Sequence, residues 1–111
     1  MIDEVKPIEA VVQFARRWYG IKPLAVASGG FHRQIEQTLE ALKIRLLFGA
    51  VVCAEDYTRG KPCPDPFLEA ARRLCVVPTE CLVFEDSPLG IQAAAGAGMQ
   101  SVLVPRTAIY R

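Results

Sequence analysis

Short apolar runs alternate along this chain with segments of helical periodicity, and that order constrains the fold more than any other feature. The apolar runs span residues 23–28, 48–56, 81–85 and 101–104, and the helical stripes span 8–19, 31–42, 65–74 and 88–95. The runs are continuously apolar rather than alternating, which is typical of strands buried on both faces. The order predicts an α/β fold, a three-layer Rossmann-like parallel sheet with helices on both faces, forming one domain over residues 1–111.

Residues that favour helix ends support these boundaries. Gly20 is a stop signal for the first helix, and Gly96 and Gly98 are stop signals for the last. Asp65 is expected to cap the third helix, with Pro66 at its first position, and Ser87 is expected to open the fourth.

Composition excludes several classes of protein. The net charge of the 111 residues is +1, and the basic residues are scattered in pairs, which argues against nucleic-acid binding. The longest apolar run, 46–54, is too short for a bilayer, which needs about 20 residues. The start, MIDEVKP, lacks the apolar core of a signal peptide, so a cytoplasmic location and no membrane partner are expected. The four cysteines have no metal-finger spacing and are expected to be free thiols, and His32 is the only histidine.

Candidate functional residues follow three of the predicted strands. Ser28, Gly29 and Gly30 follow the first, Lys61 lies in the loop after the second, and the adjacent Glu85 and Asp86 follow the third. Ligands bind at the carboxyl ends of strands in open parallel sheets, so these positions define a candidate site. Each signal has an ordinary explanation when taken alone: a turn, a solvated lysine, and acids that favour a helix dipole.

Taken together, the three signals indicate phosphoryl chemistry. A hydroxyl, backbone N–H groups and a lysine suit a phosphate, and adjacent carboxylates suit Mg²⁺, whose charge offsets their repulsion. Sites that bind a phosphate together with Mg²⁺ are typical of phosphoryl-transfer enzymes. Other phosphate motifs are absent, since the chain has no GxGxxG and Lys61 does not belong to a P-loop.

Three stretches resemble signature motifs of the haloacid dehalogenase superfamily, in its β-phosphoglucomutase and sugar-phosphate phosphatase branch. They are AVASGG at 25–30, GKPCPDPF at 60–67 and LVFEDSPLGIQAAAGAGM at 82–99, and the resemblance runs from about residue 5 to residue 106. It implies that Ser28 and the N–H of Gly29 bind the transferring phosphoryl group and that Lys61 neutralises it. It further implies that Asp86 and Glu85 hold Mg²⁺, and that the substrate is a small sugar phosphate.

One motif of that family is missing from the chain. The family's nucleophile is the first aspartate of a DxDGT stretch, and none of the aspartates here, Asp3, Asp56, Asp65 and Asp86, begins a D-x-D. The helical cap domain that selects substrate is also missing. The chain is therefore expected to be inactive alone, as the C-terminal part of such an enzyme, because covalent phosphoryl transfer needs the aspartyl nucleophile.

Two other interpretations remain beside this one. The chain could be a non-catalytic module or one half of a two-chain enzyme. A phospho-receiver domain is disfavoured because its acids precede its hydroxyl and lysine, whereas here the order is hydroxyl, lysine, acids.

The resemblance also predicts a gap in the sheet. It places the missing nucleophile strand between the strand that ends at Ser28 and the strand that ends at Glu85. Unpaired strand edges invite pairing with other chains. We therefore expect another segment to fill the gap, the two flanking strands to pair directly, or a partner chain to contribute a strand.

Overall fold

The computed structural model describes residues 9–104, in which helices and strands alternate as expected. The helices are α1 (Glu9–Trp18), α2 (His32–Ala41), α3 (Asp65–Leu74) and α4 (Pro88–Gly96), and the strands are β1 (Ala25–Ala27), β2 (Ala50–Val52), β3 (Leu82–Glu85) and β4 (Gln100–Leu103). Three 3₁₀ turns join them, namely η2 (Arg45–Leu47), η3 (Ala54–Asp56) and η4 (Pro78–Glu80). The α/β class with parallel strands is confirmed.

The strands form two parallel pairs rather than one sheet. β1 pairs with β2 in the register Ala25 to Ala50, and β3 pairs with β4 in the register Leu82 to Gln100. Within residues 9–104 no pairing joins β1 to β3, so the gap predicted between these two strands is present and no single sheet forms in this part of the chain. Direct pairing of the two flanking strands is wrong for the same reason. Periodicity identified the strands but carries no information about which strands are neighbours.

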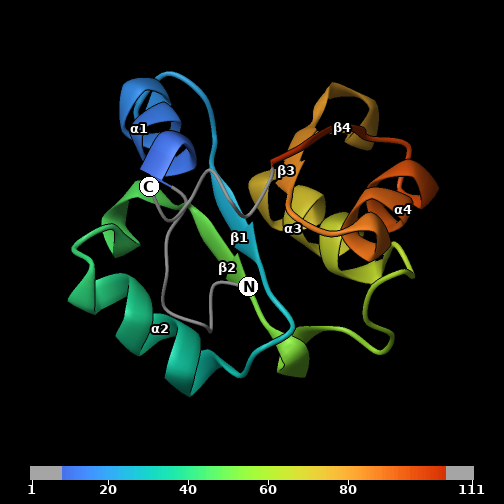
Figure 1. Cartoon of the computed structure of the whole chain (residues 1–111), viewed down its shortest axis with the longest axis horizontal. Coiled ribbons are helices and arrows are strands. Elements are labelled where there is room, and N and C mark those ends of the chain that lie inside the picture. The colour runs from blue at the N-terminus through green and yellow to red at the C-terminus, as the bar shows by residue number, and fades with distance from the viewer. Residues whose placement is uncertain (1–8, 105–111) are drawn as a thin grey trace.

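Helices cover both faces of the β1–β2 pair, as predicted. On one face α1 and α2 lie against the strands, and on the other α3 and α4 pack together (Figure 1). The core is correspondingly split. One cluster of buried residues contains Val26, Ile35, Leu39, Ile44, Val51 and Cys53, and the other contains Phe67, Ala71, Val83, Ala93, Ala94, Ala97 and Met99.

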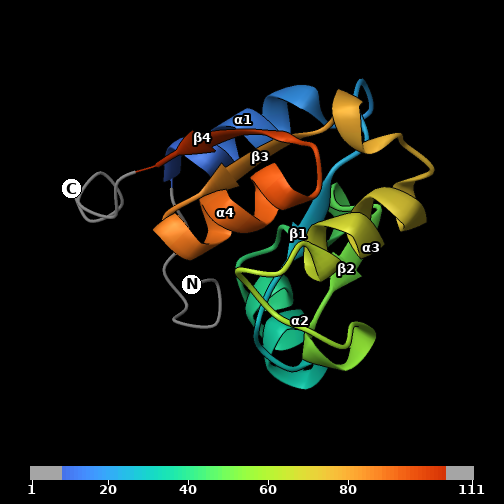
Figure 2. The same cartoon turned by 90° about the vertical axis from the view of Figure 1, so that its right-hand side faces the viewer.

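The β3–β4 pair is less buried than its sequence suggests. Val83 is 8% exposed, whereas Leu82 and Leu103 are 49% and 55% exposed. Figure 2 shows α4 lying along β3 and β4 on one side. Among the described residues, α1 approaches the opposite side through Phe14, whose ring centroid lies 4.8 Å from that of Phe84. The expectation that these strands are buried on both faces is therefore wrong within residues 9–104.

The helix ends agree with the sequence signals except at one position. Ser87 caps α4, because its hydroxyl accepts the N–H of Gly90, and Gly98 adopts φ +78° after that helix. Asp65 is instead the first residue of α3, with Pro64 at the N-cap, and the Asp65 carboxylate accepts from the guanidinium of Arg59.

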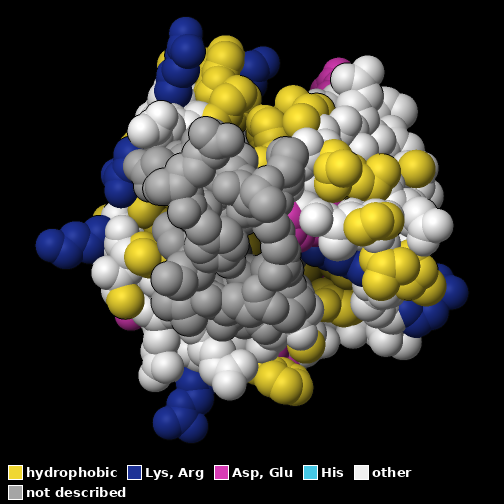
Figure 3. Space-filling model, in the orientation of Figure 1, with side chains coloured by type: hydrophobic (Ala, Val, Ile, Leu, Met, Phe, Trp, Pro, Cys, Tyr) yellow, Lys and Arg dark blue, Asp and Glu magenta, His cyan; other side chains and the backbone are white. Residues whose placement is uncertain are grey.

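In the described part of the chain, the basic side chains seen in Figure 3 are scattered over the surface and the cysteines form no disulfide. On the face seen in Figure 3 the basic side chains stand apart at the periphery rather than in one patch. All four cysteines are free, as expected. None of the described helices is long and apolar enough to cross a bilayer.

Candidate active site

The loop between η3 and α3 carries Lys61 to the ends of two strands that do not pair. Its Nζ lies 2.7 Å from Oε2 of Glu85, the last residue of β3, and 3.5 Å from the carbonyl oxygen of Ala27, the last residue of β1. The same ammonium lies 5.1 Å from the ring centroid of Phe67, within range of a cation–π interaction. Lys61 thus links the two strand pairs at their carboxyl ends.

Ser28 follows β1 in a turn that leads into α2. Its N–H donates to the carbonyl of Val52 (2.8 Å), which extends the β1–β2 ladder by one residue. Its hydroxyl accepts the N–H of Gly30 (3.0 Å), and the residue is 5% exposed. Because a hydroxyl can donate and accept together, its proton remains able to serve a phosphate oxygen.

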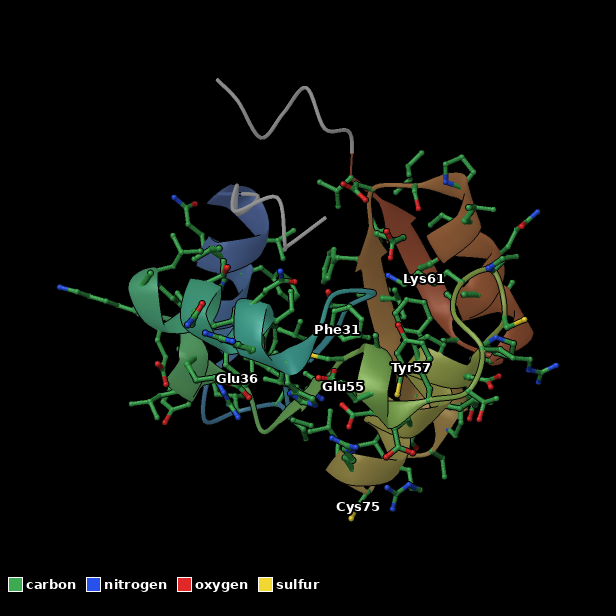
Figure 4. All side chains as sticks on the ribbon, turned by 90° about the horizontal axis from the view of Figure 1, so that it is seen from below. Phe31, Glu36, Glu55, Tyr57, Lys61 and Cys75 are labelled. Atoms are coloured by element: carbon green, nitrogen blue, oxygen red, sulfur yellow. The ribbon has the colours of Figure 1, made fainter. Side chains whose placement is uncertain are left out.

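Tyr57 holds the lysine loop against this turn, and sequence reasoning missed it. Its hydroxyl donates to the carbonyl of Ser28 (2.9 Å). Burial raises the pKa of Tyr57, and the nearby Cys53 and Asp56 raise it further, so the phenol keeps its proton. Figure 4, viewed from below, shows Tyr57 and Lys61 in the same part of the molecule. The only sequence signal for Tyr57 was its position directly after Glu55 and Asp56, at the end of the predicted strand 48–56.

The carboxylate of Glu85 is held on both oxygens. Oε2 contacts Lys61, and Oε1 accepts the N–H of Asp86 (3.1 Å) and the hydroxyl of Ser87 (3.4 Å). Glu85 lies directly over Gly90, where a Cβ atom would be 1.9 Å from the Glu85 Cγ. Only glycine at position 90 lets the carboxylate occupy this place. Asp86 is half-buried beside it.

The structure therefore brings some of the predicted residues into contact and leaves others linked only through neighbours. Lys61 touches Glu85 directly, and Glu85 is bonded to the backbone of Asp86. Lys61 reaches Ser28 only through the preceding carbonyl and through the Tyr57 loop. The Lys61 ammonium therefore lies between the turn that carries the Ser28 hydroxyl and the adjacent acids Glu85 and Asp86.

The sole histidine lies elsewhere. The imidazole Nε2 of His32 contacts a carboxylate oxygen of Asp56, and its Nδ1 faces the carboxylate of Glu36. No hydrogen bond between His32 and Ser28 is found among the described residues, so the geometry offers no serine–histidine pair there.

Comparison with known proteins places this geometry in a family. The haloacid dehalogenase-like hydrolase family matches residues 2–98. The chain is 43% identical over 102 residues to fructose-1-phosphate phosphatase YqaB of Escherichia coli, covering 92% of this chain and 54% of that protein. The chain belongs to the haloacid dehalogenase-like hydrolases, and it spans about half the length of this curated relative.

Solved structures agree with this assignment. CbbY from Rhodobacter sphaeroides, crystallised with phosphate, is 30% identical with a TM-score of 0.76, covering 90% of this chain and 45% of that one. A β-phosphoglucomutase from Clostridium difficile is 28% identical with a TM-score of 0.74, covering 86% and 41%. The predicted resemblance to sugar-phosphate phosphatases and β-phosphoglucomutase is confirmed, and the described fold corresponds to part of theirs.

Proposed function

We propose that the chain is part of a Mg²⁺-dependent phosphoryl-transfer enzyme, a phosphatase or phosphomutase, that acts on a small sugar phosphate through an aspartyl-phosphate. One observation carries the proposal. The Lys61 ammonium lies 2.7 Å from Glu85 and 3.5 Å from the carbonyl that precedes Ser28, which sets a cation between a hydroxyl-bearing turn and an acidic pair. The Lys61 ammonium has three N–H donors, so it can also donate a hydrogen bond to an oxygen of a phosphoryl group.

Each residue has a role in this proposal that matches its present contacts. Ser28 donates its hydroxyl proton to a phosphoryl oxygen, since that hydroxyl now only accepts from Gly30. The exposed Gly29 offers its backbone N–H, and a side chain there would meet no atom within 4 Å. Lys61 offsets negative charge on the phosphoryl group, and electrostatic stabilisation of this kind is the main contribution that proteins make to phosphoryl transfer.

The acidic pair fits a magnesium ion by its donor chemistry. Mg²⁺ takes oxygen ligands and keeps several waters, and Glu85 and Asp86 supply carboxylate oxygens next to each other. Glu85 and Asp86 would hold the ion, directly or through water, with Glu85 oriented by its bonds to Lys61, Ser87 and the backbone. When bound, the ion would neutralise phosphoryl charge.

In the proposal none of the described aspartates is the nucleophile. Asp56 is held by Arg73 and His32, Asp65 pairs with Arg59, and Asp86 is assigned to the magnesium ion. In the proposal the nucleophile comes from a segment that inserts between β1 and β3. The sugar-phosphate class rests on the relatives: YqaB is a fructose-1-phosphate phosphatase, and CbbY was crystallised with xylulose-1,5-bisphosphate.

The test separates binding from turnover. With Mg²⁺, the 111-residue chain alone should hydrolyse neither fructose 1-phosphate nor p-nitrophenyl phosphate. Inorganic phosphate with Mg²⁺ should still shift the amide resonances of Gly29 and Gly30, and Lys61→Met should weaken that binding about 10-fold or more, the effect of losing a charge-assisted hydrogen bond of about 1.5–3 kcal/mol.

Two outcomes would contradict the proposal. Turnover that survives repurification and disappears in Asp86→Asn would mean that the chain carries its own nucleophile. Phosphate binding that is unchanged in both Lys61→Met and Ser28→Ala would mean that these residues do not form the site. The matched control is Lys43→Met, a lysine on the surface after α2.

The alternative, a non-catalytic module or one half of a two-chain enzyme, draws support from β1 and β3, each of which has one edge that pairs with no strand in the described part of the chain. The coding sequence upstream of Met1 discriminates between the two: an in-frame DxDGT favours the enzyme fragment, and a true start at Met1 favours the module.

A further inference from the structure

A second group of chemically active side chains lies outside the residues of the proposed phosphate site. It consists of His32 at the start of α2, Cys53 just after β2 and Asp56 at the end of η3. A nitrogen, a sulfur and a carboxylate oxygen of these residues all lie within 4.8 Å of one another. Cys53 is fully buried, and His32 and Asp56 are half-buried. The proposed reaction uses none of the three.

We propose that His32, Cys53 and Asp56 form a binding site for a transition-metal ion, with Zn²⁺ as the best match. An imidazole, a thiolate and a carboxylate make a ligand set that zinc favours, at bond lengths of about 2.0–2.3 Å. Tetrahedral bonds of that length place ligand atoms roughly 3.3–3.5 Å apart, so the direct contact between His32 Nε2 and Asp56 has to open by a small side-chain movement when the ion enters. Water completes the fourth position.

The surroundings of the three residues resemble the outer shell of a metal site. The other imidazole nitrogen of His32, Nδ1, faces Glu36 Oε2 at 3.8 Å. With the metal on Nε2, the proton would reside on Nδ1 and face that carboxylate, and a small movement of Glu36 would complete the hydrogen bond that commonly supports a metal-bound histidine. The other oxygen of Asp56, Oδ1, pairs with the guanidinium of Arg73 at 3.1 Å.

Backbone groups orient the remaining two ligands. The N–H of Cys53 donates to Asp56 Oδ2 (2.8 Å), and the N–H of Asp56 donates to the Cys53 sulfur. Burial, Asp56, Glu55 and Glu36 raise the pKa of Cys53 to about 12, so the thiol keeps its proton in the metal-free protein. Metal binding releases the thiol proton of Cys53 to solvent, and the metal takes its place.

The site would fasten two segments that flank the Ser28 turn. The carboxylate of Glu55 accepts the N–H of His32 at 3.0 Å and 3.1 Å, so the loop after β2 already caps α2. Figure 4 shows Glu55 and Glu36 on the α2 side of the molecule, away from Lys61. An ion there adds a third link between this loop and the start of α2, beside the Glu55 and Tyr57 bonds.

Sequence spacing hides this site. Its ligands are separated by 21 residues and then by three, and they include neither a CxxC nor a second histidine. Only the packing of α2 against β2 brings them together. The competing explanation is a purely structural network in which His32 and Arg73 both bond to Asp56.

Cobalt titration of the chain distinguishes the two explanations, because Co²⁺ reports thiolate ligation by its near-ultraviolet charge-transfer absorption. One equivalent of Co²⁺ should give that band together with visible bands of tetrahedral cobalt. One equivalent of Zn²⁺ should abolish both, and a large excess of Mg²⁺ should not, since Mg²⁺ prefers oxygen ligands. His32→Gln should weaken cobalt binding by about 10-fold or more.

The controls test whether Cys53 is the sulfur ligand. Cys53→Ser should lose the charge-transfer band, whereas Cys63→Ser should keep it. Glu85→Gln should also keep it, which separates this site from the acidic pair. No thiolate band with the unchanged protein, or a band that persists in Cys53→Ser, would overturn the proposal. If Cys53→Ser fails to fold by circular dichroism, an unchanged cobalt affinity in His32→Gln overturns it instead.

Discussion

Gly90 determines where the carboxylate of Glu85 can lie, although it takes part in no chemistry. The Glu85 side chain occupies the space next to the Cα of Gly90, and a Cβ on residue 90 would lie 2.0 Å from Glu85 Cδ. The contact between Lys61 and Glu85 therefore depends on a missing methyl group on the first turn of α4. Close approach of this kind is a physical reason for glycine in a helix, where glycine otherwise costs roughly 0.5–1 kcal/mol relative to alanine.

Gly90→Ala should displace Glu85 and break its contact with Lys61. We expect a loss of about 1–3 kcal/mol in the free energy of unfolding, because overpacking a filled site forces side chains from their positions. Phosphate and Mg²⁺ binding should weaken as well, measured by amide chemical shifts. The control is Gly96→Ala on the same helix, where the nearest atom lies at 3.6 Å and a methyl group fits. Equal stability of both variants would contradict this account.

Helix α3 illustrates how one carboxylate organises the charges of an element. Glu69 accepts from Arg72 and Arg73, one helical turn further on, and Arg73 also reaches Asp56. The hydrogen bonds from Arg72 and Arg73 lower the pKa of Glu69 from its ordinary 4.5 to about 2. Helix α3 packs against β1, β2 and α4, so this pairing fixes an element that the lysine loop leads into.

Glu69→Gln should therefore destabilise the protein at neutral pH and have little effect in strong acid. Because the folded pKa of Glu69 lies below the unfolded value, its stabilising contribution is complete above pH 4.5 and is lost as the pH falls toward 2. The difference in unfolding free energy should stay below about 1 kcal/mol, since exposed pairs are screened by solvent. Urea denaturation of both proteins at pH 7 and pH 2 measures it, and a difference that grows in acid would show the sign to be wrong.

At the scale of the whole molecule, the dominant feature is that β1 and β3 each keep one edge that pairs with no strand within residues 9–104. Ser28 N–H bonds to β2, so the alternate residues Ala25 and Ala27 direct their backbone groups away from β2. The carbonyls of Cys81 and Glu85 bond toward β4, so Leu82 and Phe84 direct theirs away from β4. Each such group that is buried without a partner costs about 1–3 kcal/mol.

We expect the amides of Ala25, Ala27, Leu82 and Phe84 to exchange with deuterium faster than those of Val26 and Val83 in the isolated chain. In the proposed complete enzyme an inserted parallel strand would protect all of them. Hydrogen exchange measured by NMR, with sedimentation analysis to detect a partner copy, provides the test. Equal protection in a cooperative monomer would mean that the chain satisfies these edges by itself, and the argument for a missing strand would fail.

The sequence alone determined the element order and the helix ends, because periodicity and capping act over a few neighbouring residues. The third helix was predicted to begin at Pro66 and run to residue 74, and α3 spans Asp65–Leu74, while Ser87 caps α4 as expected. It also identified the family, through motifs at three strand ends. The Asp65 cap was wrong because Arg59 competes for that carboxylate, a contact that no local pattern encodes.

Only the tertiary structure decided which strands are neighbours and which side chains meet. The pairing of β1 with β2, the Tyr57 bond to Ser28 and the contact of His32 with Asp56 each join residues more than 20 positions apart. The 2.7 Å contact of Lys61 with Glu85 spans 24 positions and depends on the space left by Gly90. Such contacts arise from packing between elements, and the periodicity within one element carries no information about its neighbours.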